Sequence, residues 1–179
     1  MKWVTRSHVH VDRIACPWLI NKFIDKDAEF FFIPWPGPLP TREMGTPFDF
    51  PNPDFELGHH NGRCTFEAII KKYDIRDPWV QELAEIVHAA DVASDIDKAP
   101  EARGVEAISA GSMYIVNDDY EALEKGFTMY DALYVYVQLE KIREKYKGEL
   151  AKIERGKQFD FIKAHVKEAP KAVVKRLSR

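Results

Sequence analysis

Residues 56–68, ELGHHNGRCTFEA, carry the densest set of side chains that could bind a metal ion or act as a nucleophile. His59, Cys64 and Glu67 lie close together in this segment, and imidazole, thiol and carboxylate groups are all ordinary transition-metal ligands. A mixed set of this kind suits zinc, iron or copper better than magnesium. The segment contains neither CxxC nor HExxH, so it matches no standard zinc motif.

Cys64 stands immediately before an expected helix, whose free N–H groups would stabilise a thiolate. Glu67 follows three residues later, and this spacing is also that of a capping box, in which the glutamate side chain reaches back to the backbone. Cysteine is a poor helix cap, so the capping interpretation leaves the sulfur unexplained. Both interpretations stay open at this point.

A second group of reactive side chains lies in the N-terminal motif HVHVDRIACPWLI. His8 and His10 are two residues apart, so both rings could reach one metal ion from an extended segment, although simple exposure to solvent is the plainer interpretation. Asp12 could cap the helix that follows or meet its positive end, whereas Arg13 opposes that end and needs an acid or an oxyanion beside it. Cys16 supplies the second thiol.

Two further acids stand where an isolated carboxylate is unfavourable. Asp91 is expected at the end of an amphipathic helix, where the dipole disfavours it, so it needs a metal, Arg13 or a backbone donor as partner. Asp131 is flanked by large apolar residues in MYDALY and is expected to turn inward toward a cation. His88 and His165 have polar neighbours and are interpreted as surface residues.

These patterns predict a metal site that draws on His59, Glu67 and Asp91, with zinc or iron as the transition metal. Arg13 is expected to bind the ligand, because a guanidinium offers paired donors to a tetrahedral oxyanion. A lone thiol cannot complete a two-electron dithiol cycle, so the two thiols would act together only if the fold brings them close. The candidate catalytic residues are Asp12, Arg13, Cys16 and Cys64.

The elements that must position these groups predict an α+β fold, predominantly helical with a small N-terminal β-sheet. KWVTR and AEFFFIP are typical of strands, and residues 35–57 hold six of the eleven prolines and predict a long loop. We expect the first helix to begin near Cys16, because proline is tolerated in a first turn. Gly126 is expected to divide a long helix that Asn117 and Asp118 cap. The further helices are expected at residues 65–75, 78–94, 100–116, 117–153 and 158–177.

The bulk composition indicates one ordinary domain, since the chain has 179 residues, of which 45% are hydrophobic and 31% charged. It contains no apolar run long enough for a membrane span and no export signal, so we expect a cytoplasmic protein with no membrane contact and free thiols. Residues 141–179 hold 13 Lys and Arg against 5 Asp and Glu. We therefore divide the chain into a body, 1–140, and a basic amphipathic helical tail, 141–179.

The motifs also resemble a known family. VDRIACPWLINKFID, AEFFFIP, PFDFP, ELGHHNGRCTFEAIIKKY, AEIVHAADVA and GFTMYDALYVY follow the order and spacing of the C-terminal domain of the chromate-resistance protein family ChrB, from Trp3 to Val137. The resemblance implies a cytoplasmic protein tied to chromate resistance, with a regulatory or sensing role. In comparison with full-length ChrB, we expect the chain to lack the separate N-terminal domain and to add the basic tail. The family's polar signature falls on Asp12, Arg13, Cys16, His59, Cys64, Glu67, Asp91 and Asp131.

Three functional hypotheses follow from these features. The first is a metal-binding domain that acts on or senses a small oxyanion or redox ligand, with Arg13 and one or both thiols at its site. The second is a regulatory module without catalysis, whose basic tail contacts DNA, a partner or a second copy of the chain; a solvated helix face is the simpler interpretation of the same charges. In the third, the polar signature only holds the fold together through buried hydrogen bonds.

Overall fold

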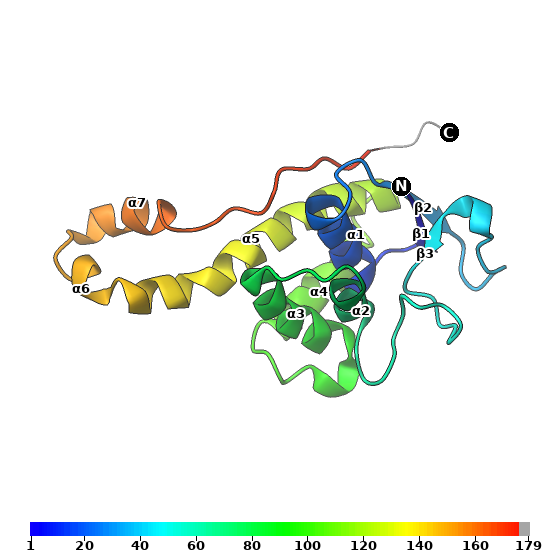
Figure 1. Cartoon of the computed structure of the whole chain (residues 1–179), viewed down its shortest axis with the longest axis horizontal. Coiled ribbons are helices and arrows are strands. Elements are labelled where there is room, and N and C mark those ends of the chain that lie inside the picture. Colours follow the sequence, from blue (N-terminus) through cyan, green and yellow to red (C-terminus); the bar gives the residue numbers. More distant parts are fainter. Residues whose placement is uncertain (176–179) are drawn as a thin grey trace.

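A three-stranded parallel sheet lies at the N-terminal end of the molecule in the computed structural model, which describes residues 1–175 (Figure 1). The strands are β1 (Lys2–Arg6), β2 (Glu29–Ile33) and β3 (Thr46–Pro47), and the strand order is β2-β1-β3. β1 pairs with β2 along its whole length, from Lys2 opposite Glu29 to Arg6 opposite Ile33. The prediction of a mostly helical α+β fold with a small N-terminal sheet is confirmed.

Helix α1 (Asp12–Phe23) connects β1 to β2 and is buried along most of its length. The prediction that this helix begins near Cys16 is wrong, because the helix starts four residues earlier and Pro17 lies inside it. Tertiary contacts override the proline signal: Asp12 accepts a hydrogen bond from the backbone N–H of Thr65 at 2.6 Å, which fixes the start of the helix against the next one. Asp12 and Arg13 are thus the first two residues of the helix, and Asp12 makes no side-chain cap.

Three shorter helices follow along the chain, of which the first two pack against α1 and the third packs against the second. The loop before them contains a 3-10 turn, η1 (Arg42–Met44), and a second turn, η2 (Ala93–Asp95), follows α3. Asp77 caps α3 by accepting hydrogen bonds from the N–H groups of Trp79 and Val80. The three helices are α2 (Thr65–Lys72), α3 (Pro78–Asp91) and α4 (Ala102–Ser112).

Helix α5 (Asp119–Lys145) is one continuous helix, so the predicted division at Gly126 is wrong. Asp118 caps it by accepting a hydrogen bond from the N–H of Glu121, as predicted. Glycine at position 126 serves packing instead, since a Cβ there would lie 2.3 Å from Ile14 Cγ2. This close approach sets the distance between α5 and α1.

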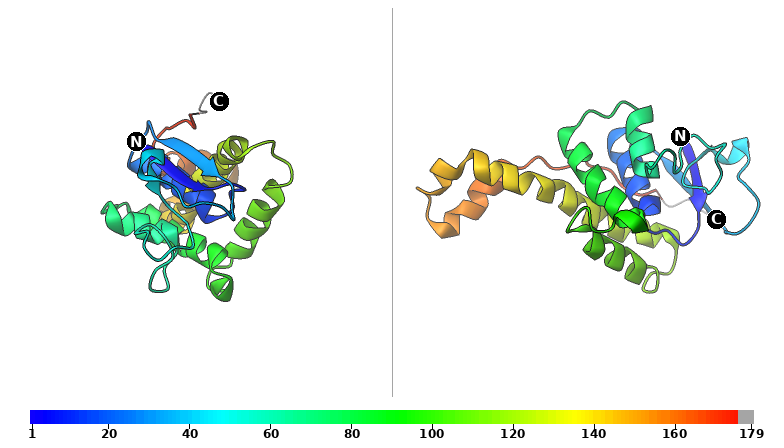
Figure 2. Two further views of the ribbon diagram at one scale, coloured as in Figure 1. Left: turned by 90° about the vertical axis from the view of Figure 1, so that its right-hand side faces the viewer. Right: turned by 90° about the horizontal axis from the view of Figure 1, so that it is seen from below.

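The C-terminal half of α5 projects from the body and ends in α6 (Lys147–Leu150), η3 (Arg155–Lys157) and α7 (Gln158–Lys163) (Figures 1 and 2). The chain then returns along α5 without helical structure, so the helix predicted over 158–177 ends early; residues 176–179 lie outside the described part. Gln138 explains the difference, because its amide pairs with both the N–H and the C=O of Lys167 at 2.8 Å and so competes with helix formation.

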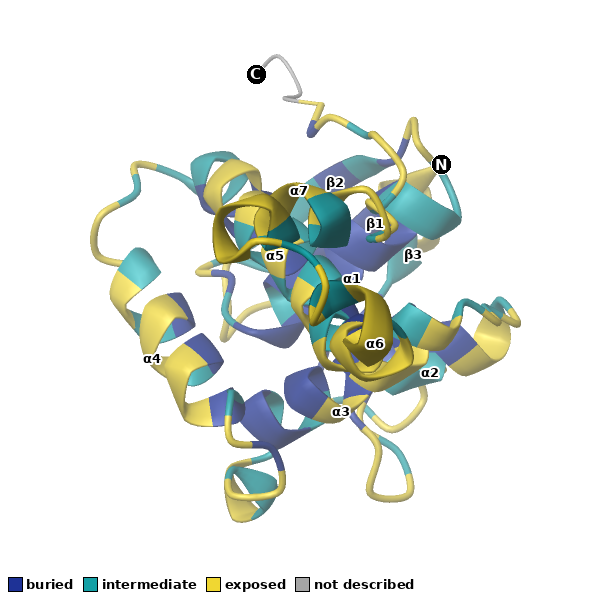
Figure 3. Cartoon of the chain, turned by 90° about the vertical axis from the view of Figure 1, so that its left-hand side faces the viewer, coloured by how far each residue is buried: buried dark blue, intermediate teal, exposed yellow. Residues whose placement is uncertain are grey.

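The body of the molecule contains the buried residues, whereas the projecting C-terminal helices α6 and α7 are exposed (Figure 3). The core is built from α1, α2, α3, α5 and the sheet, with Trp3, Trp18 and Phe66 fully buried in it. No residue of α6 or α7 is buried, whereas most of α1 is. Within residues 1–175, no helix combines the length and apolar character needed to cross a membrane.

Candidate metal centre

Three carboxylates converge on one imidazole at the junction of α1, α2 and α3. Asp12 begins α1, Asp49 follows β3, and Asp91 ends α3, while His59 comes from the loop before α2. His59 Nε2 lies 2.9 Å from an Asp91 carboxylate oxygen, 3.5 Å from Asp49 and 3.6 Å from Asp12. We call Asp12, Asp49, His59 and Asp91 the His59 cluster. Ligand atoms of the first three lie within 4.8 Å of one another, which suits a shared cation.

Two arginines hold Asp49 in place. Arg6 Nη2 and Arg13 Nη1 both donate to Asp49 Oδ2, at 2.8 and 2.9 Å, and the Thr65 hydroxyl donates to Asp49 Oδ1 at 3.1 Å. Asp49 adopts a positive φ of 53°, a conformation that aspartate tolerates better than most side chains. The acid that the sequence required beside Arg13 is therefore Asp49. Arg13 Nη2 donates to the carbonyl oxygen of His8, whereas its buried Nε has no hydrogen-bond partner among the described residues.

Asp12 is almost completely buried, with 1% of its side chain exposed. Its Oδ2 accepts from the Thr65 N–H, but among the described residues its Oδ1 has no hydrogen-bond partner. The preceding Val11 has φ 23°, which is a strained conformation for a β-branched residue. A buried, unpartnered carboxylate oxygen is unfavourable in its ionised form unless a proton or a cation binds it.

The charges of the His59 cluster shift its pKa values in opposite directions. Hydrogen bonds with Asp49 and Asp91 raise the pKa of His59 to about 10. Burial alone would raise the pKa of Asp49, but the contact with His59 and the charges of Arg13 and Arg6 lower it to about 2. Burial, together with the charges of Asp91 and Asp49, raises the pKa of Asp12 well above its ordinary value. Without a metal, the cluster therefore retains protons that a bound cation would replace.

His59 is the exposed member of its cluster, with 48% of its side chain accessible. It lines a cleft of about 300 Å³ together with Arg6, Asp49 and residues 50–53. The cleft gives solvent a direct route to His59 and Asp49. The prediction that Asp91 needs a partner is confirmed: it contacts His59 and accepts a hydrogen bond from the backbone N–H of Asp12 at 3.4 Å.

A second imidazole lies between two carboxylates, one turn before Asp91 on α3. His88 Nδ1 contacts Glu67 Oε2 at 2.7 Å, and His88 Nε2 contacts Asp95 Oδ2 at 2.8 Å. Cys64, Glu67 and His88 bring three possible ligand atoms within 4.8 Å of one another. We call these residues with Asp95 the His88 cluster. The interpretation of His88 as a surface residue is wrong, because only 14% of its side chain is exposed.

Glu67 lies in the His88 cluster and not with His59 and Asp91, so the structure brings together only two of the three residues expected to form one metal site. The capping interpretation of Cys64 and Glu67 is confirmed, since Glu67 Oε2 accepts a hydrogen bond from the Cys64 N–H at 2.9 Å. The same carboxylate thus caps α2 and contacts His88.

Both thiols are buried and free. Burial raises the pKa of Cys16 and of Cys64, and the negative charge of Asp12 adds to the effect in both cases. The expectation of a thiolate stabilised by the helix start at Cys64 is therefore wrong for the metal-free protein, because burial outweighs the helix dipole. The nearby Cys64 is among the causes that raise the pKa of Cys16, but no disulfide joins the two thiols.

The remaining predicted groups lie outside both clusters. Asp131 accepts hydrogen bonds from Trp18 Nε1 at 2.8 Å and Lys22 Nζ at 3.0 Å, so the cation expected beside it is Lys22. His8 is exposed, and His10 lies 3.9 Å from Glu106. Across residues 1–175, neither of these histidines belongs to a group of three possible metal ligands.

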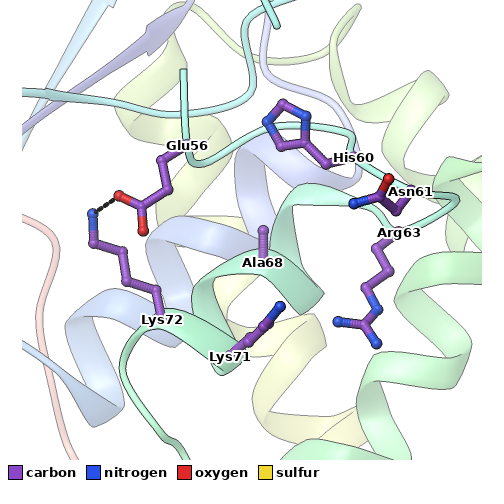
Figure 4. A pocket seen from close by; sticks show the side chains of 7 residues that line it. All are labelled: Glu56, His60, Asn61, Arg63, Ala68, Lys71 and Lys72. Carbon is purple, nitrogen blue, oxygen red and sulfur yellow. Dashed lines mark hydrogen bonds and ion pairs between the residues drawn. The ribbon is translucent and has the colours of Figure 1, made fainter. Parts of the chain in front are cut away.

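A pocket of about 480 Å³ opens beside α2 (Figure 4). Lys72 pairs with Glu56 on one side of it, and Arg63 lies on the other with Lys71 between them. In the described part of the chain, no ion pair or hydrogen bond engages the side chain of Arg63 or Lys71. Asn61 and Gly62 adopt positive φ values of 53° and 74° in the tight turn that places Arg63.

Sequence reasoning missed Asp49 and assigned His88 to the surface. Asp49 sits between two phenylalanines in FDF, the same signal of an acid among large apolar residues that identified Asp131. His88 and Asp91 are three residues apart, so one face of α3 had to present both. Arg6 and Thr65, which hold Asp49, carry no distinctive local pattern.

Comparisons with known proteins assign the chain to a protein family. The sequence profile described as ChrB, C-terminal domain, matches residues 3–137, and the chain belongs to this family. It is similar to Protein ChrB of Cupriavidus metallidurans, with 34% identity over 137 residues, which is 75% of this chain. The match spans 40% of that relative's length. No solved structure matched the chain.

Proposed function

We propose that this domain binds a divalent transition-metal ion in the His59 cluster and uses it to sense an oxyanion or redox ligand. The observation that carries the proposal is Asp12, whose Oδ1 is buried beside two further carboxylates and has no hydrogen-bond partner within residues 1–175. An ionised carboxylate is costly in such surroundings and burial raises the pKa of Asp12, so a bound cation would replace a proton there. Asp12, Asp49 and His59 are the proposed protein ligands, with Asp91 beside them.

The donor chemistry supports zinc or iron, because the set combines carboxylate oxygens with one imidazole nitrogen. Binding requires His59 Nε2 to release its proton, so the metal and the proton compete for the same position. Arg6 and Arg13 remain on the outer oxygen of Asp49, which leaves Oδ1 facing His59. They fix the orientation of this ligand in the way that outer-shell partners do in metal sites.

The oxyanion is proposed to bind at Arg63 and Lys71 and not at Arg13. Arg13 already donates to Asp49 and to the carbonyl of His8. Arg63 and Lys71 instead have no ion-pair partner within the described residues, and both line one pocket of about 480 Å³. Two unpaired cations facing one hollow favour a small dianion such as chromate or sulfate.

We further propose that the domain acts in chromate resistance by binding and not by thiol redox chemistry. The resemblance to the ChrB family supports the biological setting. Burial of both Cys16 and Cys64 keeps the thiols protonated and away from solvent, which disfavours direct electron transfer to a dissolved oxyanion.

The metal content of protein purified without a histidine tag tests the proposal. The parent is expected to carry zinc or iron at the His59 cluster, and His59→Ala and Asp49→Asn are each expected to lose about one equivalent. His10→Ala is the matched control, because His10 lies outside both clusters, and its metal content should equal that of the parent. Unchanged metal in His59→Ala would overturn the proposal.

The oxyanion pocket is tested separately by calorimetric titration with chromate and with sulfate. Arg63→Ala and Lys71→Ala are each expected to weaken anion binding by roughly tenfold, the effect of losing one charge-assisted contact. Arg103→Ala is the control, since Arg103 lies on α4, pairs with Asp97, and its substitution removes the same charge elsewhere. Equal affinity in all three variants would exclude this pocket.

A further inference from the structure

We propose that Cys64, Glu67 and His88 form a second metal site, with a thiolate ligand, which is separate from the His59 site. The three side chains come from the start of α2 and the last turn of α3. Their possible ligand atoms, a sulfur, a carboxylate oxygen and a ring nitrogen, all lie within 4.8 Å of one another. This mutual distance is what one bound ion requires of three protein ligands.

The second ring nitrogen of His88 supplies an independent observation. A metal-binding histidine commonly donates its other ring N–H to a carboxylate, which fixes the orientation and the tautomer of the ring. His88 Nε2 lies 2.8 Å from Asp95 Oδ2, so Nδ1 is the nitrogen that faces Glu67 and Cys64. Asp95 is itself held by Lys98 at 2.7 Å. The ring is thus already oriented as a ligand.

An ion pair among Glu67, His88 and Asp95 would explain the imidazole and both carboxylates without any metal. The Cys64 sulfur accepts a hydrogen bond from the backbone N–H of Glu67 as a helix N-cap, but a hydroxyl or carboxylate side chain serves better there, so capping does not account for the choice of a thiol. A bound metal ion accounts for all the members of the cluster at once. The thiol, the imidazole and the carboxylate then each have a role.

Binding of a divalent cation balances by proton release. The ion displaces one proton from the Cys64 thiol and the proton shared between His88 Nδ1 and Glu67, and it bonds to the sulfur, the nitrogen and the carboxylate. A sulfur, nitrogen and oxygen set of this kind suits Zn²⁺, with one coordination position left for water or an anion.

Glu67 provides the route of access. It lines a pocket of about 560 Å³ that also includes Arg63 and Lys71. Cys64 is buried behind it, so an ion reaches the sulfur past the carboxylate. The same two unpaired cations border the oxyanion pocket, and an anion bound there would lie beside the open side of the metal site.

Cobalt(II) is the probe that distinguishes this site from the His59 cluster, since only a thiolate ligand gives an intense sulfur-to-cobalt charge-transfer band in the near ultraviolet. The metal-free full chain titrated with Co²⁺ is expected to show this band. Cys64→Ser should abolish it, whereas Cys16→Ser, which changes the other buried thiol, should leave it intact. A parent without the band, or a band unchanged in Cys64→Ser, would refute the second site.

Two more variants keep the test decisive. His88→Gln is expected to weaken Co²⁺ binding in this site at least tenfold and to shift the band, which guards against a fold defect peculiar to Cys64→Ser. His59→Ala removes the other cluster, so it should lower total metal while the charge-transfer band persists. Loss of the band in His59→Ala but not in His88→Gln would assign the thiolate to a different site and contradict the proposal.

Discussion

The His59 and His88 clusters each place carboxylates around one imidazole, but they differ in which partner is buried. In the His59 cluster two of the three acids are buried, with 1% of Asp12 and 4% of Asp49 exposed, while 15% of Asp91 is exposed and the histidine is half exposed. In the His88 cluster the histidine is 14% exposed and its acids are more accessible, at 27% for Glu67 and 20% for Asp95.

This difference in burial determines how much each cluster contributes to the free energy of unfolding. Buried carboxylates cannot be stabilised by water, so the His59 cluster depends on Arg6, Arg13 and a proton or a metal ion. The acids of the His88 cluster are partly solvated and screened, and their contribution to stability is smaller. One cluster therefore depends strongly on buried ion pairs for its stability, whereas solvent screens the charges of the other.

The largest expected effect is the loss of the Asp49 charge. Asp49→Asn keeps a side chain that tolerates the positive φ, but it leaves Arg6 and Arg13 facing a neutral amide. Removing one partner of a buried charge network costs about 3 to 5 kcal/mol. The free energy of unfolding, measured in urea, should fall by this amount in the metal-free protein.

Asp95→Asn is the matched control, because it makes the same change on the partner of the other histidine. It should reduce the free energy of unfolding by clearly less than Asp49→Asn does. Equal losses in the two variants would show that burial does not distinguish the two clusters.

The sequence predicts one cluster of ligands where the structure has two. His59 and Asp91 could be recognised from the sequence as candidate site residues. His59 follows a glycine and Asp91 stands at a helix end, and neither has a local partner for its charge. Their separation from Glu67 depends on the packing of α2 against α3, which no local pattern contains. Burial also reverses the expected behaviour of Cys64, whose thiol keeps its proton despite the adjacent helix start.

The fold was more predictable than the site. The strands β1 and β2 and the amphipathic helices α2 and α3 follow from periodicity in the sequence. The start of α1 and the end of the C-terminal helix do not, because Thr65 and Gln138 fix them through contacts distant in sequence. Side chains that bind backbone groups from afar leave no trace in the local pattern.

A second prediction concerns the packing that positions only one of the clusters. Gly126→Ala would place a Cβ 2.3 Å from Ile14 Cγ2 and push α1, which carries Asp12 and Arg13, away from α5. Overpacking of this kind costs about 1 to 3 kcal/mol, which urea unfolding would measure. Metal binding at the His59 cluster should weaken, while the cobalt band of the His88 cluster should persist.

Gly111→Ala is the control for this substitution. No atom lies within 4 Å of a Cβ built at Gly111, and alanine favours the helix by up to about 1 kcal/mol. The variant should be as stable as the parent or slightly more so. A loss in Gly111→Ala as large as that in Gly126→Ala would show that contact with Ile14 is not the cause.

The smallest expected effect is a dependence of stability on pH in the metal-free protein. The carboxylates around His59 raise its pKa from its ordinary value of 6.5 to about 10. A raised pKa in the folded state means that the stabilisation is complete below about pH 6.5 and is lost as the pH rises toward 10. Because 48% of the side chain is exposed, solvent screening limits the change to roughly 1 kcal/mol.

Unfolding of the chelator-treated protein at a series of pH values from 6 to about 10 measures this loss. His59→Gln should flatten the profile, whereas His8→Gln, which changes an exposed histidine outside both clusters, should leave it as in the parent. A flat profile in the parent would mean that the acids around His59 do not stabilise its charged form. The proton would then be no substitute for a metal ion, and the contrast between the two clusters would rest on burial alone.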